Sequence, residues 1–387
     1  MLEEAEKLTD QLIKLRRTFH EYPETGFTET ETTGRIESTL KNLGIETERI
    51  GTKTGVMGTI QGNGSGPVVA LRADMDALPI QELNDIPYRS KRDGVMHACG
   101  HDVHMTCLLG AAKLLQDKKD QFKGTVKLLF QPAEEIDTGA KYCIEEGVLQ
   151  GVDAIFGLHN TPDLPVGTIG IQTGPSMAAT DRFVIHLTGV GGHGAQPQVT
   201  KDPVVTAAAV IQGLQTIVAR NINPADTAVV SCCSIHGGDM YNVIPATVTL
   251  TGTVRTFSTE LQDYIARRMK DLTELIAQGY GVQSELEYIK ELPPLVNPAD
   301  MAELCRQAAR IIVGPDRIKA PAPYMISEDF AIYQQQIPGA FVFLGVGNPA
   351  AACDKPLHSP DYMIDERALP YGAAMLAQTA LEFLGKK

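Results

Sequence analysis

Acidic and imidazole side chains follow several strongly apolar segments in this sequence of 387 residues. Each segment is predicted to be a strand, and those at 68–71 and 341–346 have the continuous hydrophobicity of strands buried on both faces. The segments and the groups that follow them are 68–71 with Asp74 and Asp76, 125–130 with Glu134 and Glu135, 155–158 with His159, and 341–346 with His358. Because ligands bind beyond the carboxyl ends of the strands in open parallel sheets, we expect these groups to lie at one edge of one sheet.

A further set of side chains, His97, Cys99 and His101, stands just before a helix predicted over residues 102–116. The N-terminus of that helix would point to the same sheet edge. Histidine, cysteine and carboxylate donors together suit a first-row divalent cation such as zinc or manganese. The set is larger than one tetrahedral zinc ion needs. It therefore favours a pair of ions about 3.5–4 Å apart, with a bridging group and a water molecule between them.

Glu134 and Glu135 are adjacent, so on an extended backbone their side chains point in opposite directions. One of them is therefore expected to bind metal and the other to face the substrate. A carboxylate in the second position would act as general base, because it can take a proton from a metal-bound water whose pKa the metal has already lowered. The spacing between His97 and Cys99 also permits His97 to be a ligand.

Six motifs occur along the chain in the order MHACGHDVH, QPAEE, GLHN, GGHGAQP, SEDF and LHSPDY. Together they resemble the di-metal aminoacylase and carboxypeptidase clan. Within that clan the resemblance is to the amidohydrolases that include hippurate hydrolases, N-acyl-amino-acid deacetylases and plant auxin-conjugate hydrolases. It extends from about His20 to Tyr362. It implies a catalytic α/β domain with an inserted dimerisation domain and two metal ions in each subunit.

The resemblance also implies a role for each candidate site residue. Cys99 would bridge the two metals as a thiolate, and Asp76 would orient a ligand histidine and fix its tautomer. Glu134 would be the general base, which later returns the proton to the leaving amine. The other metal ligands that the resemblance implies are His101, Glu135, His159 and His358. Asp74 stands where the clan usually has a histidine, and His101 would take over that ligand duty; His97 has no ligand role in the resemblance.

The inserted domain supplies three further residues by resemblance. His193 would reach across a dimer to stabilise the oxyanion of the tetrahedral intermediate, and Asn242 and Arg255 would bind the substrate. The alternation of apolar and polar residues over 247–256 independently places Arg255 on the polar face of its strand. A guanidinium there could hold the α-carboxylate of a substrate with two hydrogen bonds.

The elements that position these residues alternate between helices and strands over most of the chain. This alternation predicts an α/β domain with a mostly parallel sheet flanked by helices. The middle of the chain differs, because its elements follow the β-α-β-β-α-β order of a split βαβ, ferredoxin-like α+β unit. We therefore expect a discontinuous catalytic domain at 1–179 and 291–387, with an inserted dimerisation or lid domain at 180–290.

Composition excludes several classes of partner. The net charge of −13 disfavours nucleic acid and anionic lipid surfaces. No apolar run approaches the roughly 20 residues of a membrane helix, and the charged N-terminal segment lacks the pattern of a signal peptide. Seven cysteines are an odd and dilute set, which does not suit a disulfide scaffold. These observations predict a reduced, cytoplasmic protein with no membrane or nucleic-acid partner.

The combined prediction is a metal-dependent amidohydrolase that cleaves the amide bond of N-acyl-L-amino acids as a homodimer joined through its inserted domain. Zinc or manganese is favoured, and cobalt or nickel would also suit the donors. A metallo-dipeptidase or carboxypeptidase with the same site is the first alternative. A non-catalytic ligand-binding protein is the second. An enzyme with Cys99 as a thiol nucleophile is the third, although it leaves the two adjacent glutamates and His358 without a purpose.

Overall fold

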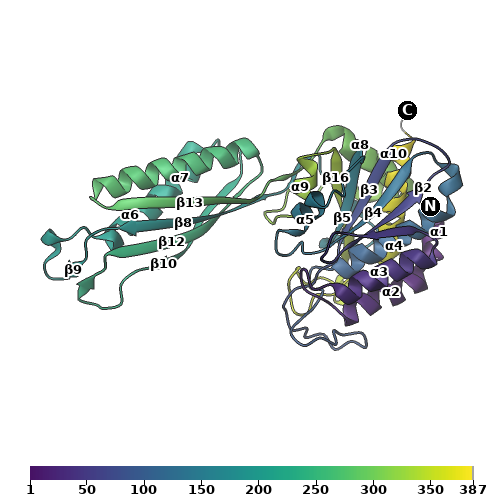
Figure 1. The fold of residues 1–387 in the computed structure, drawn as a ribbon, viewed down its shortest axis with the longest axis horizontal. Coiled ribbons are helices and arrows are strands. Elements are labelled where there is room, and N and C mark those ends of the chain that lie inside the picture. The colour runs from purple at the N-terminus through teal and green to yellow at the C-terminus, as the bar shows by residue number, and fades with distance from the viewer. Residues whose placement is uncertain (386–387) are drawn as a thin grey trace. The chain divides into compact units, whose positions relative to one another are not determined.

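A computed structural model describes residues 1–385 and divides them into two compact units (Figure 1). The first unit contains Met1–Gly174, Val296–Ala322 and the described residues from Asp329 onward. The second unit contains Pro175–Leu295 and Pro323–Glu328. The predicted catalytic domain at 1–179 and 291–387 includes residues 323–328. They fall in the second unit instead, because Tyr324 exchanges backbone hydrogen bonds with Ser176 and Ala178.

The first unit is built on one sheet of eight strands in the order β1-β2-β4-β3-β5-β16-β6-β15. The strands are β1 (Glu46–Arg49), β2 (Val56–Gln61), β3 (Val68–Asp74), β4 (Thr125–Gln131), β5 (Ala154–Pro165), β6 (Ile169–Gly170), β15 (Ile318–Lys319) and β16 (Gly339–Gly347). β3 runs parallel to β4 and β5, and β16 runs parallel to β5. These four parallel strands are the ones that the sequence analysis expected to carry the site.

Eight α-helices belong to the described part of this unit. They are α1 (Leu2–Glu6), α2 (Thr9–Glu21), α3 (Thr30–Asn42), α4 (His101–Asp117), α5 (Gly139–Glu145), α8 (Ala299–Val313), α9 (Phe330–Gln334) and α10 (Leu369–Leu384). α1 and α2 pack on the helices α4 and α10 rather than on the sheet. α4 and α10 pack on each other and on β3, whereas α5 packs on β4 and on α9. Because the sheet is covered by helices, every residue of β16 is buried, which explains its continuous apolar sequence. The predicted α/β class is confirmed.

The second unit is a sheet of four antiparallel strands in the order β10-β12-β8-β13, with two helices on one face (Figure 1). Its main elements are β8 (Ala179–Thr188), α6 (Pro203–Thr216), β10 (Ala228–His236), β12 (Thr247–Thr256), α7 (Thr259–Gly279) and β13 (Gln283–Leu292). This order confirms the predicted β-α-β-β-α-β arrangement. Two further short pairs occur in the chain: β9 (Gly192–His193) pairs with β11 (Val243–Ile244), and β7 (Gly174–Met177) pairs with β14 (Leu295–Asn297).

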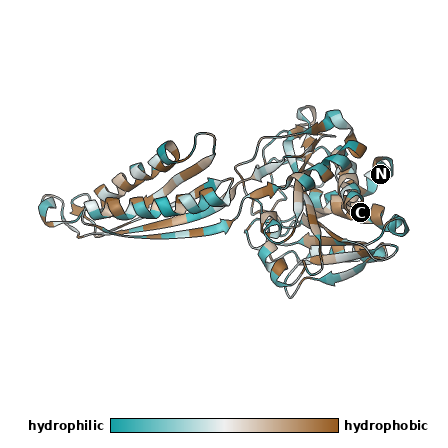
Figure 2. Ribbon diagram, turned by 90° about the horizontal axis from the view of Figure 1, so that it is seen from above, coloured by the Kyte–Doolittle hydropathy of each residue, from teal (hydrophilic) through white to brown (hydrophobic). Residues whose placement is uncertain are grey.

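The helices of the second unit begin where their capping residues predict. The side chain of Asp202 accepts hydrogen bonds from the amides of Val204 and Val205, directly before the Pro203 that opens α6. Ser258 caps α7 in the same way. Hydrophobic and hydrophilic residues are interspersed along the helices of this unit (Figure 2), as expected for helices with one face packed on a sheet.

One stretch corrects the expectation that no segment reaches the length of a membrane span. Within residues 1–385, Pro203–Asn221 is a helical stretch of 19 residues with a mean hydropathy of 1.2, long and apolar enough to cross a membrane by length and composition. Its buried side chains, among them Val210, Leu214 and Ile217, belong to the core of the second unit. A core helix of a small unit passes the same test of length and composition, because one of its faces must be apolar to pack on the sheet.

Candidate metal centre

Four parallel strands of the first unit bring the expected side chains to one region. β3 ends at Asp74, two residues before Asp76, and β4 ends just before the loop with Glu134 and Glu135. His159 lies inside β5 rather than after it, because β5 continues its pairing with β16 as far as Pro165.

The cysteine motif reaches this region through the start of α4. Gly100 is the N-cap of α4 and has a φ of 82°, and a Cβ atom there would lie 2.4 Å from the side-chain nitrogen of Asn160. Only glycine fits both the left-handed backbone and the close approach. The loop after β16 is tied to the same motif, since the amide of His358 donates to the carbonyl of Ala98 at 2.9 Å.

The predicted donors form overlapping groups. In each group, one donor atom from each residue lies within 4.8 Å of the donor atoms of the other two. The groups include Cys99–His101–His159, Cys99–Glu135–His358 and His101–Glu134–Glu135. The Cys99 sulfur is 3.4 Å from His159 Nε2, and His358 Nε2 is 3.6 Å from Glu135 Oε2. Because Cys99 belongs to two of the groups, the arrangement suits two ions that share one thiolate.

Burial and hydrogen bonds set the protonation states of His159 and Cys99 in the metal-free protein. Nδ1 of His159 donates to the carbonyl of Asn160 at 2.6 Å, which leaves Nε2 as the free acceptor toward Cys99. Burial holds the pKa of His159 well below its ordinary value, so its ring is neutral, as a metal ligand must be. Burial raises the pKa of the Cys99 thiol well above its ordinary value, and the carboxylates of Glu135 and Glu134 raise it further.

The surroundings of His101 provide an independent test of fit. The ring is fully buried, and its Nε2 has no hydrogen-bond partner but lies 3.7 Å from Glu135 Oε1 and 3.9 Å from Glu134 Oε2. Burial works against a charged ring, yet Asp74 and the carboxylates near it raise the pKa of His101 to about 10. Buried negative charge of this density calls for a cation, so the residues present fit a divalent metal pair.

Asp76 organises the glutamate loop. Its two carboxylate oxygens accept hydrogen bonds from the backbone amides of Glu134 and Glu135, both at 3.0 Å. One of those oxygens also lies 3.4 Å from Nδ1 of His101. Asp76 therefore touches a predicted ligand histidine, as expected, and also holds the backbone of both glutamates, which the sequence analysis did not foresee.

Asp74 is engaged by groups other than the metal donors. Its Oδ1 lies 2.5 Å from His104 Nδ1, and its Oδ2 accepts from Arg72 at 2.7 Å. Arg72 is completely buried and also donates to Asp329 and to Gln131, at 2.7 Å and 2.8 Å. Although Asp74, His101 and His104 could together hold an ion, both oxygens of Asp74 already have partners. The sequence reasoning did not single out Arg72 as part of the site. An arginine within an otherwise apolar strand could have indicated a buried charged partner.

His97 does not join the donors. In the described part of the chain, none of the possible metal-binding groups includes it. Both of its ring nitrogens are buried without a hydrogen-bond partner, and burial lowers its pKa to about 3. The ligand role that spacing alone allowed for His97 has no support in the geometry.

The three substrate-binding candidates belong to the second unit. His193 in β9 pairs with Val243 in β11, and the carbonyl of Asn242, in the turn just before β11, accepts from the amide of Gly194 at 2.8 Å. His193 and Asn242 therefore lie close together along the backbone pairing of β9 and β11. Arg255 lies on the less buried face of β12, as predicted, where its guanidinium donates to Thr253 and to the carbonyl of Val254.

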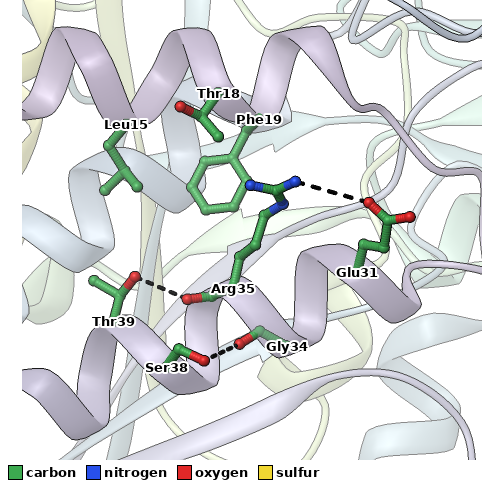
Figure 3. A pocket seen from close by; sticks show the side chains of 8 residues that line it. All are labelled: Leu15, Thr18, Phe19, Glu31, Gly34, Arg35, Ser38 and Thr39. Carbon is green, nitrogen blue, oxygen red and sulfur yellow. Dashed lines mark hydrogen bonds and ion pairs between the residues drawn. The ribbon is translucent and has the colours of Figure 1, made fainter.

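A separate cavity of about 580 Å³ lies between α2 and α3 (Figure 3). Its lining is Leu15, Thr18, Phe19, Glu31, Gly34, Arg35, Ser38 and Thr39. The hydroxyls of Ser38 and Thr39 donate to carbonyls of their own helix, and Arg35 faces Glu31 at 3.8 Å. None of the predicted site residues lines this cavity.

Comparison with known proteins decides the family. The model of peptidase family M20/M25/M40 matches residues 70–382. The chain belongs to this family.

The chain is 45% identical to N-acetyl-L-cysteine deacetylase of Bacillus subtilis (strain 168) over 97% of this chain and 89% of that protein. It is 41% identical to IAA-amino acid hydrolase ILR1-like 4 of Arabidopsis thaliana, over 97% and 86% of the two chains. The crystal structure of the Bacillus subtilis YXEP protein, described as a dinuclear metal binding peptidase, superposes with a TM-score of 0.87, with 41% identity over 98% and 99% of the chains.

These findings confirm the resemblance and the class of enzyme. The protein is a metal-dependent hydrolase of the M20 family that acts on amide bonds. The overlapping donor groups and the dinuclear relative support two metal ions, without showing which metal they are.

Proposed function

We propose that this enzyme hydrolyses the amide bond of N-acyl-L-amino acids. The observation that carries the proposal is the overlap of two donor groups at Cys99, with Glu134 in a third group that shares His101 and Glu135 with them. The deacetylase and the auxin-conjugate hydrolase named above support an acylated amino acid as the substrate. Two divalent ions, zinc or manganese, would be held by Cys99, His101, Glu135, His159 and His358.

The bound metal pair would supply Lewis-acid polarisation of the scissile carbonyl and a water of lowered pKa. The residues of the chain supply the rest. Glu134 takes the proton from that water and returns it to the leaving amine. Its position for this task is supported by the bond from its own amide to Asp76, at 3.0 Å, which limits the directions in which its side chain can extend.

The second unit would bind the substrate. Arg255 would hold the α-carboxylate, and Asn242 and His193 would orient the amide and stabilise the oxyanion. We propose that His193 acts on the site of a partner subunit in a homodimer joined through the second unit. Exposed apolar side chains on α6 support such an interface, with Val204 41% and Val205 51% exposed. We also propose a cytoplasmic location, which the seven free cysteines support.

The proposed function is tested by amine release from a panel of substrates. The panel contains amino acids N-acylated with acetyl, succinyl, benzoyl and indole-acetyl groups, and dipeptides with a free amino group as the comparison. We expect turnover of the acylated amino acids and little turnover of the dipeptides. The reverse preference would establish the metallo-dipeptidase or carboxypeptidase alternative. Metal-loaded protein with no turnover on either set would favour a ligand-binding protein.

Removal of metal is expected to abolish amine release. Protein dialysed against a chelator should lose activity and regain it when Zn²⁺ or Mn²⁺ is added, and elemental analysis should find about two ions per subunit. The control is alkylation of the apo and the metal-loaded protein, since bound metal should protect Cys99. Activity that survives the chelator but is lost on alkylation would move the chemistry to Cys99 as a nucleophile.

A mixing experiment tests the role of His193 across subunits. Glu134→Gln and His193→Ala should each be inactive alone. After subunit exchange, a heterodimer of the two would contain one complete site, so a 1:1 mixture should recover about a quarter of the wild-type activity. No recovery, with heterodimers demonstrated by mass spectrometry, would place His193 in the site of its own subunit or outside the mechanism.

A further inference from the structure

The segment between α2 and α3 contains a buried glutamate with an unusual use. Glu29 is 0% exposed and occupies the N-cap position of α3, but its side chain makes no capping hydrogen bond. Glu24 performs that task instead, because its Oε2 accepts from the amide of Thr32 at 2.8 Å and from its hydroxyl at 2.9 Å. The carboxyl group of Glu29 is therefore free to serve another part of the molecule.

That part is the loop that contains the two active-site glutamates. Oε1 of Glu29 accepts a hydrogen bond from the amide of Ala133 at 2.9 Å, and Oε2 accepts from the hydroxyl of Thr54 at 2.6 Å. No lysine or arginine within residues 1–385 forms an ion pair with Glu29. Its two contacts across the fold are thus a hydroxyl and the backbone directly before Glu134.

Ala133 needs such support. Its φ is 57°, in the left-handed region that residues other than glycine rarely adopt and keep only where their surroundings hold them. The backbone of Gly26, three residues before Glu29, also packs closely against Ala133. A Cβ atom on Gly26 would lie 3.2 Å from both Cα and Cβ of Ala133. The carbonyl of Ala133 accepts from the amide of Gly139 at 3.0 Å.

Three consecutive amides of this loop are held by two buried carboxyl groups. Glu29 holds the amide of Ala133, and Asp76 holds the amides of Glu134 and Glu135. The same segment also touches the Asp76 loop, because the amide of Ala77 donates to the carbonyl of Glu24 at 2.8 Å. The backbone that sends one glutamate to the metals and the other to the substrate is thereby clamped at each of these residues.

We propose that Glu29 is a positioning residue for hydrolysis. By holding the amide of Ala133 in its left-handed conformation, it sets the directions in which the side chains of Glu134 and Glu135 leave the backbone. The proposal rests on the proposed roles of these two glutamates. Glu29 itself touches neither metal donors nor substrate.

The hydrogen bonds do not depend on the charge of Glu29. Burial raises the pKa of Glu29 to about 7, the hydrogen bond from Thr54 opposes this rise, and Asp76 adds to it. A protonated carboxyl still accepts from Ala133 through its carbonyl oxygen and can donate to Thr54 through its hydroxyl. Glutamine offers the same acceptor and donor at the same length, whereas aspartate keeps the charge but is shorter by one methylene.

The test therefore compares Glu29→Gln with Glu29→Asp. Glu29→Gln should keep kcat within about threefold of the wild type, and Glu29→Asp should lower kcat by about 10²-fold with KM changed by less than about threefold. The matched control is Glu24→Asp, which shortens another buried glutamate of the same segment. The side chain of Glu24 caps the start of α3 and pairs with Arg92. The control should retain kcat.

A second readout does not depend on activity. In metal-free protein, hydrogen–deuterium exchange of the segment 131–137 should be faster in Glu29→Asp than in the wild type and unchanged in Glu29→Gln and Glu24→Asp. Wild-type kcat and wild-type exchange in Glu29→Asp would overturn the proposal, as would equal losses in Glu29→Asp and Glu24→Asp. If Glu134→Gln were fully active, the proposed function would fail, whatever the result at Glu29.

Discussion

Replacing Glu134 with glutamine is expected to lower kcat by at least about 10²–10⁴-fold, the usual contribution of a general base. Glutamine matches the size of glutamate and its amide oxygen still accepts hydrogen bonds, but it takes up no proton at neutral pH. The amide of Glu134 would keep its bond to Asp76. Because proton transfer occurs in the transition state, kcat and kcat/KM should fall together, which steady-state kinetics on an N-acyl amino acid would measure.

The adjacent residue provides the matched control. Glu135 belongs to the donor group with Cys99 and His358, so Glu135→Gln should lose activity together with part of the bound metal. Glu134→Gln should instead keep the metal content of the wild type, as measured by elemental analysis after dialysis. Near-normal turnover of Glu134→Gln would show that the base is another group. Loss of metal in both variants would make Glu134 a ligand rather than a base.

Replacing Arg72 with methionine is expected to lower the free energy of unfolding by about 3–5 kcal/mol. The guanidinium is completely buried and donates to Asp74 and Asp329, both at 2.7 Å and both also buried. Methionine fills much of the volume but removes the guanidinium that donates to both buried carboxylates. Urea unfolding of chelator-treated protein, analysed at constant m, would measure the change without a contribution from bound metal.

A surface arginine serves as the control for Arg72. Arg49 is 55% exposed and pairs with Glu37 at 2.9 Å, so Arg49→Met should change the free energy of unfolding by less than about 1 kcal/mol. A loss at Arg72 no greater than the loss at Arg49 would mean that the buried carboxylates find other partners or take up protons. A wild-type midpoint in both variants would contradict the stabilising role of the network.

Much of the fold follows from local patterns. The apolar segments at 68–71, 125–130, 155–158 and 341–346 all lie in strands of one sheet, because a strand covered on both faces must be apolar throughout. The β-α-β-β-α-β order of the second unit was likewise visible. The segment Pro323–Glu328 groups with the second unit, and six residues without periodicity carry no local sign of the backbone partner they find near Ser176.

The site, like the fold, was predicted in part from the sequence. The residue types and their positions at strand ends predicted the donors before any contact was known. They did not predict which oxygens are already occupied. The structure adds that the two oxygens of Asp74 contact Arg72 and His104, partners that no motif indicated. His97, two residues from Cys99, has donors of the right kind but lies outside every donor group within residues 1–385.

The sequence by itself determined the chemistry of this protein: a metal-dependent amidohydrolase whose cysteine, histidines and carboxylates gather at four parallel strands of one mixed sheet. Only the tertiary structure decided how that chemistry is held in place. Arg72 meets Asp329 across 257 residues, and Glu29 meets Ala133 across 104. Such pairs leave no periodicity in the chain, because they exist only once the sheet and its loops have brought distant segments together.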